Sequence, residues 1–110
     1  MNALIKTTEV SCSLQNNKEI NKLVKLFKEK IEEAISNNKS IVTILTNPFV
    51  ECRNNLHIED YELNEEYLYL NGNNFEIHIT HNNVTDLKYD NTEDECFIIT
   101  CGDNEAIFIF

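Results

Sequence analysis

The strongest periodic signal in the chain is an amphipathic helix between residues 17 and 37. Apolar residues recur there at spacings of three and four, which is typical of a helix with one buried face. The stripe consists of Ile20, Leu23, Val24, Phe27, Ile31, Ala34 and Ile35, widened by Leu26. Asn16-Asn17-Lys18-Glu19 provides an N-cap candidate with a glutamate three residues on. Asn37-Asn38 marks the expected end, so the helix has about twenty residues.

From Ser40 onward the apolar period changes to two, which is typical of strands. Residues 41–45 are almost continuously apolar, as in a central strand, and Asn47-Pro48 ends them. Asn71-Gly72 predicts a hairpin turn, and Gly102-Asp103-Asn104 predicts another. Shorter strands are predicted over residues 56–63, 67–70, 75–80, 84–89, 96–101 and 106–110, with 3–10 as a further candidate.

A helix followed by roughly five to seven short strands predicts an α+β fold, with one long N-terminal amphipathic helix packed on an antiparallel sheet. At 110 residues the chain has room for one core. We therefore expect a single domain over residues 1–110, with the helix at about 17–37 and the sheet at about 40–110. A small, strongly bent barrel with an N-terminal helix, as in Sm-like or SH3-like folds, is the alternative.

The segment Ala106–Phe110 alternates large apolar groups on two faces. Phe108 and Phe110 face one way, and Ile107 and Ile109 face the other. We predict a strand paired with residues 97–101 and buried on at least one face, because exposed apolar residues of this kind promote aggregation. If this strand is a sheet edge, Ile107 and Ile109 mark the site of homodimerisation or of strand addition by a partner.

Charge is distributed unevenly within the net charge of −10. Residues 1–40 hold seven of the nine basic residues, whereas residues 41–110 hold Arg53 and Lys88 against fourteen acids. This scarcity of cations argues against direct nucleic-acid binding by the second part, because a phosphate backbone requires them. An acidic surface instead attracts a basic partner protein. The residues predicted to bind that partner are Glu59, Asp60, Glu62, Glu65, Glu66, Glu93, Asp94 and Glu95.

The sequence contains no motif for catalysis. It has no serine in a Gly-flanked elbow and no Gly-rich phosphate loop. Acids next to Cys96 should raise its pKa and make it a poor nucleophile. The contiguous acidic runs indicate solvated loops, since an acid–base pair needs two carboxyls in unlike surroundings. We therefore predict that the protein is not an enzyme and has no cofactor.

The cysteines and histidines do not have the spacing of a metal site. Cys96 and Cys101 are five residues apart, so on one strand they point to opposite faces, and their separation exceeds that of a zinc knuckle. His78 and His81 converge only if His81 has left the strand. Residues 90–94 resemble the start of a calcium loop but lack its later glycine and glutamate. We predict no metal ligand. The last alternative is a metal-binding regulator, with a site assembled from Cys52, His57, Cys96, Cys101 or the pair His78 and His81.

These features together predict a small acidic protein-binding module. Inhibitors from phage and mobile elements, of the anti-restriction or anti-CRISPR type, share this character, and the Asn, Lys and Ile bias indicates an AT-rich genome. The expected partner is a basic protein that handles nucleic acid. A structural or homo-oligomerising subunit, such as a homodimer, is the alternative function.

The sequence also predicts a cytoplasmic location. Residues 1–14 lack the apolar core of a secretion signal, and no window reaches the ~18 apolar residues of a membrane span. We therefore expect no membrane contact, and four cysteines in the reduced state.

Overall fold

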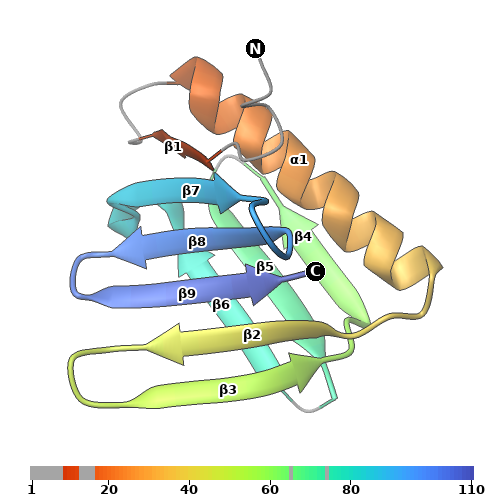
Figure 1. The fold of residues 1–110 in the computed structure, drawn as a ribbon. Helices are drawn as coiled ribbons and strands as arrows, with labels where there is room; N and C mark the ends of the chain where they lie inside the picture. Colours follow the sequence, from red (N-terminus) through yellow and green to blue (C-terminus); the bar gives the residue numbers. More distant parts are fainter. Residues whose placement is uncertain (1–8, 13–16, 65, 74) are drawn as a thin grey trace.

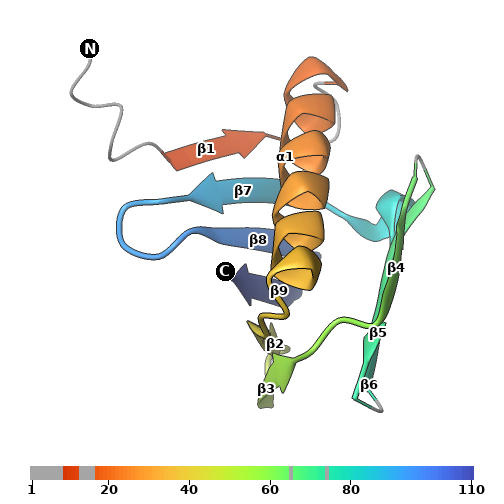
Figure 2. The ribbon, with the colours of Figure 1, turned by 90° about the vertical axis from the view of Figure 1, so that its right-hand side faces the viewer.

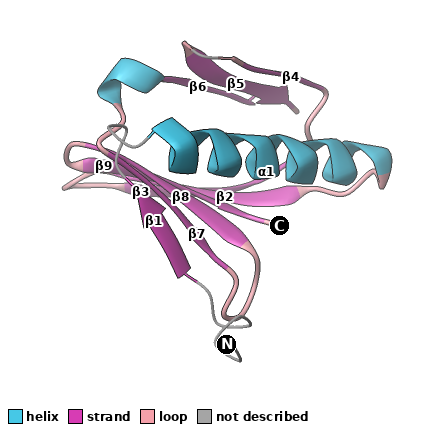
Figure 3. Ribbon diagram, turned by 90° about the horizontal axis from the view of Figure 1, so that it is seen from above, coloured by secondary structure: helices cyan, strands magenta, loops and turns pink. Residues whose placement is uncertain are grey.

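The helix α1 (Asn17–Ser36) lies between two antiparallel sheets (Figures 2 and 3). This computed structural model describes residues 9–12, 17–64, 66–73 and 75–110, with side chains from Asn21 onward. The larger sheet has six strands in the order β1-β7-β8-β9-β2-β3, and the smaller sheet has three in the order β4-β5-β6 (Figure 1). The predicted α+β class is confirmed. The strands are more numerous than expected and form two sheets.

The strands have the following bounds. The larger sheet contains β1 (Glu9–Cys12), β7 (Asp86–Asp90), β8 (Cys96–Cys101), β9 (Asn104–Ile109), β2 (Ile41–Thr46) and β3 (Glu51–Leu56). The smaller sheet contains β4 (Asp60–Leu63), β5 (Tyr67–Gly72) and β6 (Phe75–Thr80), and a short 3-10 turn over His81–Asn83 leads back to β7. Since β1 and β3 lie at opposite ends of the larger sheet, that sheet is open and is not the alternative barrel.

The side of α1 that faces the larger sheet is held by aromatic contacts. The ring of Phe27 packs edge-on against three phenylalanine rings, with centroid distances of 4.8 Å to Phe97, 5.2 Å to Phe108 and 5.8 Å to Phe110. Phe97 and Phe108 are fully buried. Edge-to-face pairs of this kind stabilise a core beyond the area that they bury.

The opposite side of α1 faces the smaller sheet. Val24 lines a small internal gap together with Leu63 and Leu68 of that sheet, and the Tyr61 hydroxyl donates a 2.6 Å hydrogen bond to Glu32 of the helix. The apolar stripe of α1 is therefore wide because it serves two sheets, one on each side.

The helix ends where the asparagine pair predicted it. Asn38 adopts a left-handed φ of 54°, a conformation that asparagine tolerates better than most residues. The Lys39 amide donates to the Ala34 carbonyl at 2.8 Å, which closes the last turn. The predicted N-cap at Asn16 and most of the strand candidate at 3–10 lie outside the described residues; the part from Glu9 onward falls in β1.

The segment 56–63 was predicted as one strand, and this prediction is wrong. The chain leaves the larger sheet at Leu56, the end of β3, and enters the smaller sheet at Asp60, the start of β4. The strand β3 was missed because it is a largely exposed edge strand, so its sequence lacks apolar alternation. Its Asn54-Asn55 pair belongs to the strand and forms no turn.

The hairpin predicted at Asn71-Gly72 exists, but its glycine acts differently from the prediction. Gly72 is the last residue of β5 and pairs with Phe75 of β6, so it belongs to the strand and not to the turn. The positive φ, 33°, belongs to Asn73. A Cβ at Gly72 would overlap the carbonyl group of His57, so Gly72 permits the close approach of the smaller sheet to the chain leaving β3.

The strand predicted at residues 106–110 is β9, and its pairing with residues 97–101 is confirmed. Its faces are also as predicted, because Phe108 and Phe110 pack in the core. The prediction that Ile107 and Ile109 mark an oligomer edge is wrong. β9 pairs with β8 on one side and with β2 on the other, so its backbone groups are used within the sheet.

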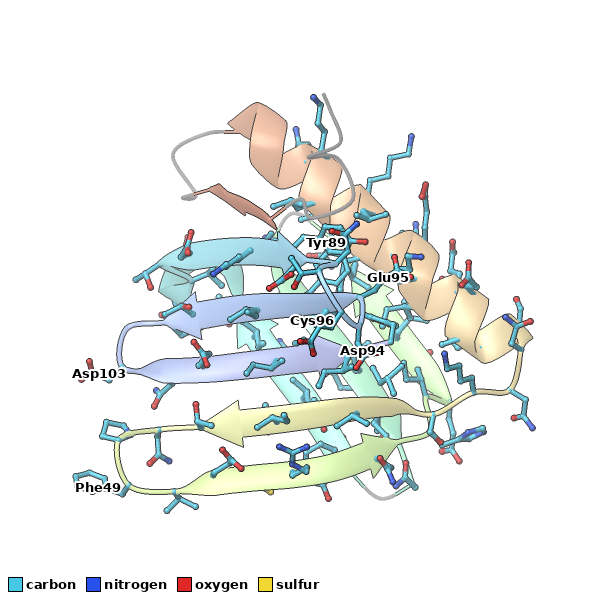
Figure 4. The ribbon with its side chains drawn as sticks, viewed as in Figure 1. Phe49, Tyr89, Asp94, Glu95, Cys96 and Asp103 are labelled. Carbon is cyan, nitrogen blue, oxygen red and sulfur yellow. The ribbon has the colours of Figure 1, made fainter. Side chains whose placement is uncertain are left out.

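A charged cluster joins α1 to the β7–β8 connection of the larger sheet. The ammonium group of Lys30 lies 2.7 and 2.8 Å from the two carboxylate oxygens of Glu95. The Tyr89 hydroxyl donates to the same carboxylate at 2.7 Å, and Figure 4 shows Tyr89 and Glu95 side by side below the helix. The Lys30 and Tyr89 hydrogen bonds hold the pKa of Glu95 below its ordinary value. Burial and the Glu95 carboxylate raise the pKa of Tyr89 to about 12.

The central place of β9 makes a deletion informative. Removing residues 107–110 takes away Phe108, which is fully buried, and separates β8 from β2. Loss of one such buried phenylalanine costs about 3–5 kcal/mol, comparable to the whole stability of a small domain. We expect an insoluble or molten chain, measured by near-ultraviolet circular dichroism. The point variant Ile109→Ser, on the opposite face, is the control and should remain folded. A folded truncated protein would contradict the prediction.

The Glu95 cluster predicts a specific loss of stability in acid. A lowered carboxyl pKa stabilises the fold above the ordinary value of about 4.3, and this contribution is lost as the pH falls below it. Glu95→Gln should therefore reduce the free energy of unfolding by about 1 kcal/mol at neutral pH, a small value because solvent screens a partly exposed pair. In the same variant the free energy of unfolding should also decrease less as the pH is lowered.

Urea unfolding at pH values between neutral and acid measures this effect. Asp94→Asn is the matched control, because Asp94 is an exposed neighbour on the same connection. Equal acid dependence in wild type and Glu95→Gln would show that the cluster does not stabilise the fold.

Candidate functional site

The acidic residues predicted to bind a partner fall into two groups on different sheets. Glu59, Asp60, Glu62 and Glu66 lie on or beside the smaller sheet, and all four are exposed. Residues 93–95 lie on the β7–β8 connection of the larger sheet. Figure 2 shows the smaller sheet and the β7–β8 connection on opposite sides of the molecule. Glu65 lies outside the described residues.

One of the predicted residues is already engaged. Glu95 binds Lys30 and Tyr89, so its charge is largely compensated within the fold. Glu93 and Asp94 are exposed next to it. This second group therefore offers less free charge than its sequence indicates.

The first group surrounds two tyrosines on the face of the smaller sheet that is turned away from α1. We call this surface the tyrosine face, and it consists of Asp60, Glu62, Tyr67, Tyr69, Glu76 and His78. Strand pairing places these side chains in cross-strand rows, since Glu62 pairs with Tyr69 and Tyr69 pairs with His78. The intervening leucines of β5, Leu68 and Leu70, are buried on the opposite face against the helix layer.

The rings of the tyrosine face contact one another. The His78 ring lies 5.1 Å from that of Tyr67 and 6.3 Å from that of Tyr69, both in edge-to-face arrangements. The Tyr69 hydroxyl donates a 3.4 Å hydrogen bond to Glu76. These contacts hold the aromatic side chains in place before any partner binds.

Neighbouring carboxylates also raise the pKa of both tyrosine hydroxyls. The Glu62 carboxylate, as a hydrogen-bond acceptor, raises the pKa of Tyr67. Partial loss of water and the charge of Glu76 raise the pKa of Tyr69. A tyrosine hydroxyl is protonated at neutral pH even at its ordinary pKa of about 10, so both hydroxyls are hydrogen-bond donors beside these carboxylates.

The stretch of sequence that forms the smaller sheet is rich in acids and lacks lysine and arginine. Between Arg53 and Lys88 the chain has no lysine or arginine, and its seven acids there are Glu59, Asp60, Glu62, Glu65, Glu66, Glu76 and Asp86. Within the described part of the chain, no lysine or arginine forms an ion pair with Asp60, Glu62 or Glu76. Partly exposed aromatic rings bordered by carboxylates that have no lysine or arginine partner are suited to bind lysine and arginine side chains.

The sequence analysis identified Asp60 and Glu62 of this surface but missed Glu76, Tyr67, Tyr69 and His78. The signal was present in β5, whose Tyr-Leu-Tyr-Leu pattern places both tyrosines opposite buried leucines. The outward position of the two tyrosines follows only from the tertiary structure, in which the helix packs on one face of the smaller sheet.

A second feature is an open cleft of about 970 Å³ between the two sheets, at the ends of the strands away from the β7–β8 connection. Its walls include Leu45, Ile99 and Ala106 from the larger sheet and Ile77 and Ile79 from the smaller sheet. Asparagines and Glu105 line its rim. Its volume is within the range of small-molecule pockets.

The cysteines and histidines are dispersed. Cys101 packs against the core while Cys96 lies on the other face of β8, as their odd separation predicted. Burial, followed by the charges of Asp90 and Asp94, raises the pKa of Cys96, which agrees with the expected direction. His78 lies on the tyrosine face, and His81 lines the gap beside α1. Among the described residues, no three or more His, Cys, Asp or Glu side chains are grouped as metal ligands.

Comparisons with known proteins concern the fold alone. Neither a protein-family profile nor a curated protein sequence matches the chain. A crystal structure of a protein from Erwinia carotovora is similar, with a TM-score of 0.51 and 10% identity over 91% of this chain and 61% of that one. The crystal structure of ChuX has a TM-score of 0.49 and 9% identity, over 91% of this chain and 62% of ChuX. The chain thus spans less than two thirds of either structure. Within the described residues, no helix is long and apolar enough to cross a membrane.

Proposed function

We propose that the protein is a binding module that docks its tyrosine face on a basic partner protein. The observation that carries this proposal is the position of Tyr67 and Tyr69 among carboxylates in a stretch of sequence without lysine or arginine. Tyrosines are enriched at protein interfaces because a rigid ring buries a large area and keeps a polar hydroxyl.

The two kinds of side chain have different tasks in this proposal. The carboxylates attract a basic surface over a distance and speed the encounter. The tyrosine rings form the contact itself, with lysine or arginine side chains of the partner stacked on them. Because His78 and Glu76 already hold the rings, little side-chain freedom is lost on binding.

The partner class follows from the charge. Proteins that handle nucleic acids carry clusters of lysine and arginine that bind phosphates, and an acidic face with suitably placed aromatic rings competes for those clusters. We therefore propose an inhibitor that occupies the nucleic-acid site of such a protein, in the manner of small acidic proteins of phage and mobile elements. In this proposal the protein itself catalyses no reaction.

The test is the rate of association with a partner isolated from the native host. Reversing Glu59, Asp60 and Glu62 to lysine should slow association about tenfold or more at low salt, and Tyr69→Ser should speed dissociation. Raising the salt concentration from about 0.05 M to about 0.5 M should abolish the difference in association rate, because it screens surface charges. Surface plasmon resonance measures both rates.

The matched control is the reversal of Glu93, Asp94 and Asp103, which are exposed acids of the larger sheet. It changes the net charge equally and should alter association far less. The proposal would be overturned if neither the salt concentration nor the reversal of Glu59, Asp60 and Glu62 changed the association rate. A larger effect of the control set would move the binding surface to the larger sheet.

The cleft between the sheets supports a second candidate function, the binding of a small amphipathic molecule. A fluorescent apolar dye such as anilinonaphthalene sulfonate should bind saturably at one site, and Leu45→Asn, which makes an apolar wall polar, should weaken that binding severalfold. Lys39→Gln, an exposed change outside the cleft, is the control. Non-saturable dye binding, or binding equal in both variants, would exclude the cleft as a ligand site.

A further inference from the structure

The strand β3 (Glu51–Leu56) forms an edge of the larger sheet. It pairs with β2 on one side, and no described strand pairs with its other side. Glu51, Cys52 and Arg53 are exposed. The turn before β3 carries Phe49 and Val50, which are 92% and 59% exposed, and Figure 4 shows Phe49 at the tip of the β2–β3 hairpin. Exposed backbone and exposed apolar side chains thus occur together at this edge.

The backbone groups that face the free edge are identified by the hairpin hydrogen bonds. The Asn47 amide donates to the Val50 carbonyl at 2.9 Å. Hydrogen-bonded and non-hydrogen-bonded pairs alternate along an antiparallel ladder. Cys52 therefore directs its backbone groups toward β2, whereas Glu51 and Arg53 direct theirs outward.

The far end of the same edge is already capped. By the same alternation Asn55 points outward, and its carbonyl accepts a hydrogen bond from the Asn73 side chain at 3.3 Å. The Asn73 side-chain oxygen also accepts from the His57 amide at 2.8 Å. The edge left open consists of Glu51 and Arg53.

We propose that this edge pairs with β3 of a second copy of the chain, antiparallel about a two-fold axis at Cys52. In this register Glu51 of each copy lies directly opposite Arg53 of the other. The two residues exchange backbone hydrogen bonds and their side chains form ion pairs, once on each side of the axis. Such an isologous contact is the commonest route to a homodimer, and it joins two larger sheets into one.

The charges select this register over its neighbours. If the two-fold axis is moved from Cys52 by one residue toward the turn, Glu51 lies opposite Glu51 of the other copy. If the axis is moved by one residue in the other direction, Arg53 lies opposite Arg53 of the other copy. That register also needs the backbone of Asn55, whose carbonyl already accepts a hydrogen bond from Asn73. Like charges directly opposite each other destabilise a strand pair, whereas opposite charges stabilise it.

The edge strand β4 of the smaller sheet is less suited to self-pairing than β3. Copies of this chain repel each other because each has a net charge of −10, so self-association needs local opposite charges. The edge strand β4 carries Asp60 and Glu62 and would bring acids together. Arg53, in contrast, is the one arginine of the chain and lies two residues from an exposed acid. The inference is independent of the tyrosine face.

Charge reversal and its rescue test the contact. Sedimentation velocity over a concentration series should show a monomer–dimer equilibrium for the wild type. Arg53→Glu and Glu51→Arg should each raise the dissociation constant about tenfold or more, since each replaces two attractive pairs by two repulsive ones. The double variant Glu51→Arg with Arg53→Glu restores opposite charges and should return the dissociation constant to near the wild-type value.

The controls are Lys39→Glu and Asp103→Arg, exposed changes of the same charge away from β3. A second readout uses the cysteine at the axis: a mild oxidant should link Cys52 of the two copies, since opposed residues at a non-hydrogen-bonded pair lie within disulfide reach. Cys52→Ser should abolish this link. A wild type that is monomeric at all concentrations, or a dimer unaffected by Arg53→Glu, would overturn the proposal.

Discussion

The burial of α1 on two sides is the constraint on which the rest of the structure depends. Phe27 packs against three phenylalanines of the larger sheet, and Tyr61 of the smaller sheet donates a hydrogen bond to Glu32 of the helix. A helix with so wide an apolar stripe cannot leave half of it in water, because each exposed apolar side chain of this size forgoes about 1.5–3 kcal/mol. The second sheet supplies the missing cover.

This arrangement explains which surface of the smaller sheet carries polar and charged side chains. A sheet covered by a helix on one face presents its other face to solvent, and in the smaller sheet that face carries the two tyrosines and their carboxylates. The helix crosses only part of the space between the sheets (Figure 3), and the part that it leaves open is the cleft of about 970 Å³. Both candidate sites therefore arise from the same packing.

The elements with strong local signals were predictable and the connections between sheets were not. The helix follows from its apolar periodicity, and the central strand β2 and the hairpin of β8 and β9 follow from apolar runs or alternation bounded by turn residues. The strand β3 was missed because an exposed edge strand has no such alternation. Asp60 and Glu62 of the tyrosine face were found from the density of acids in the sequence, whereas the isolated Glu76 was missed. The aromatic members of this face were missed because only the covered and free faces of the smaller sheet distinguish Tyr67 and Tyr69 from core residues.

By itself the sequence determined the α+β class, the extent of α1, the two-faced segment that became β9 and the acidity of the second part of the chain. These are properties of periodicity, turn chemistry and charge, which are local. Only the tertiary structure decided that the strands separate at residues 57–59 into two sheets, that β9 is internal while β3 is the edge, and that Glu95 is compensated by Lys30. Each of these depends on which distant segments meet, and that choice is made by the joint burial of the helix and both sheets rather than by any neighbouring residues in the chain.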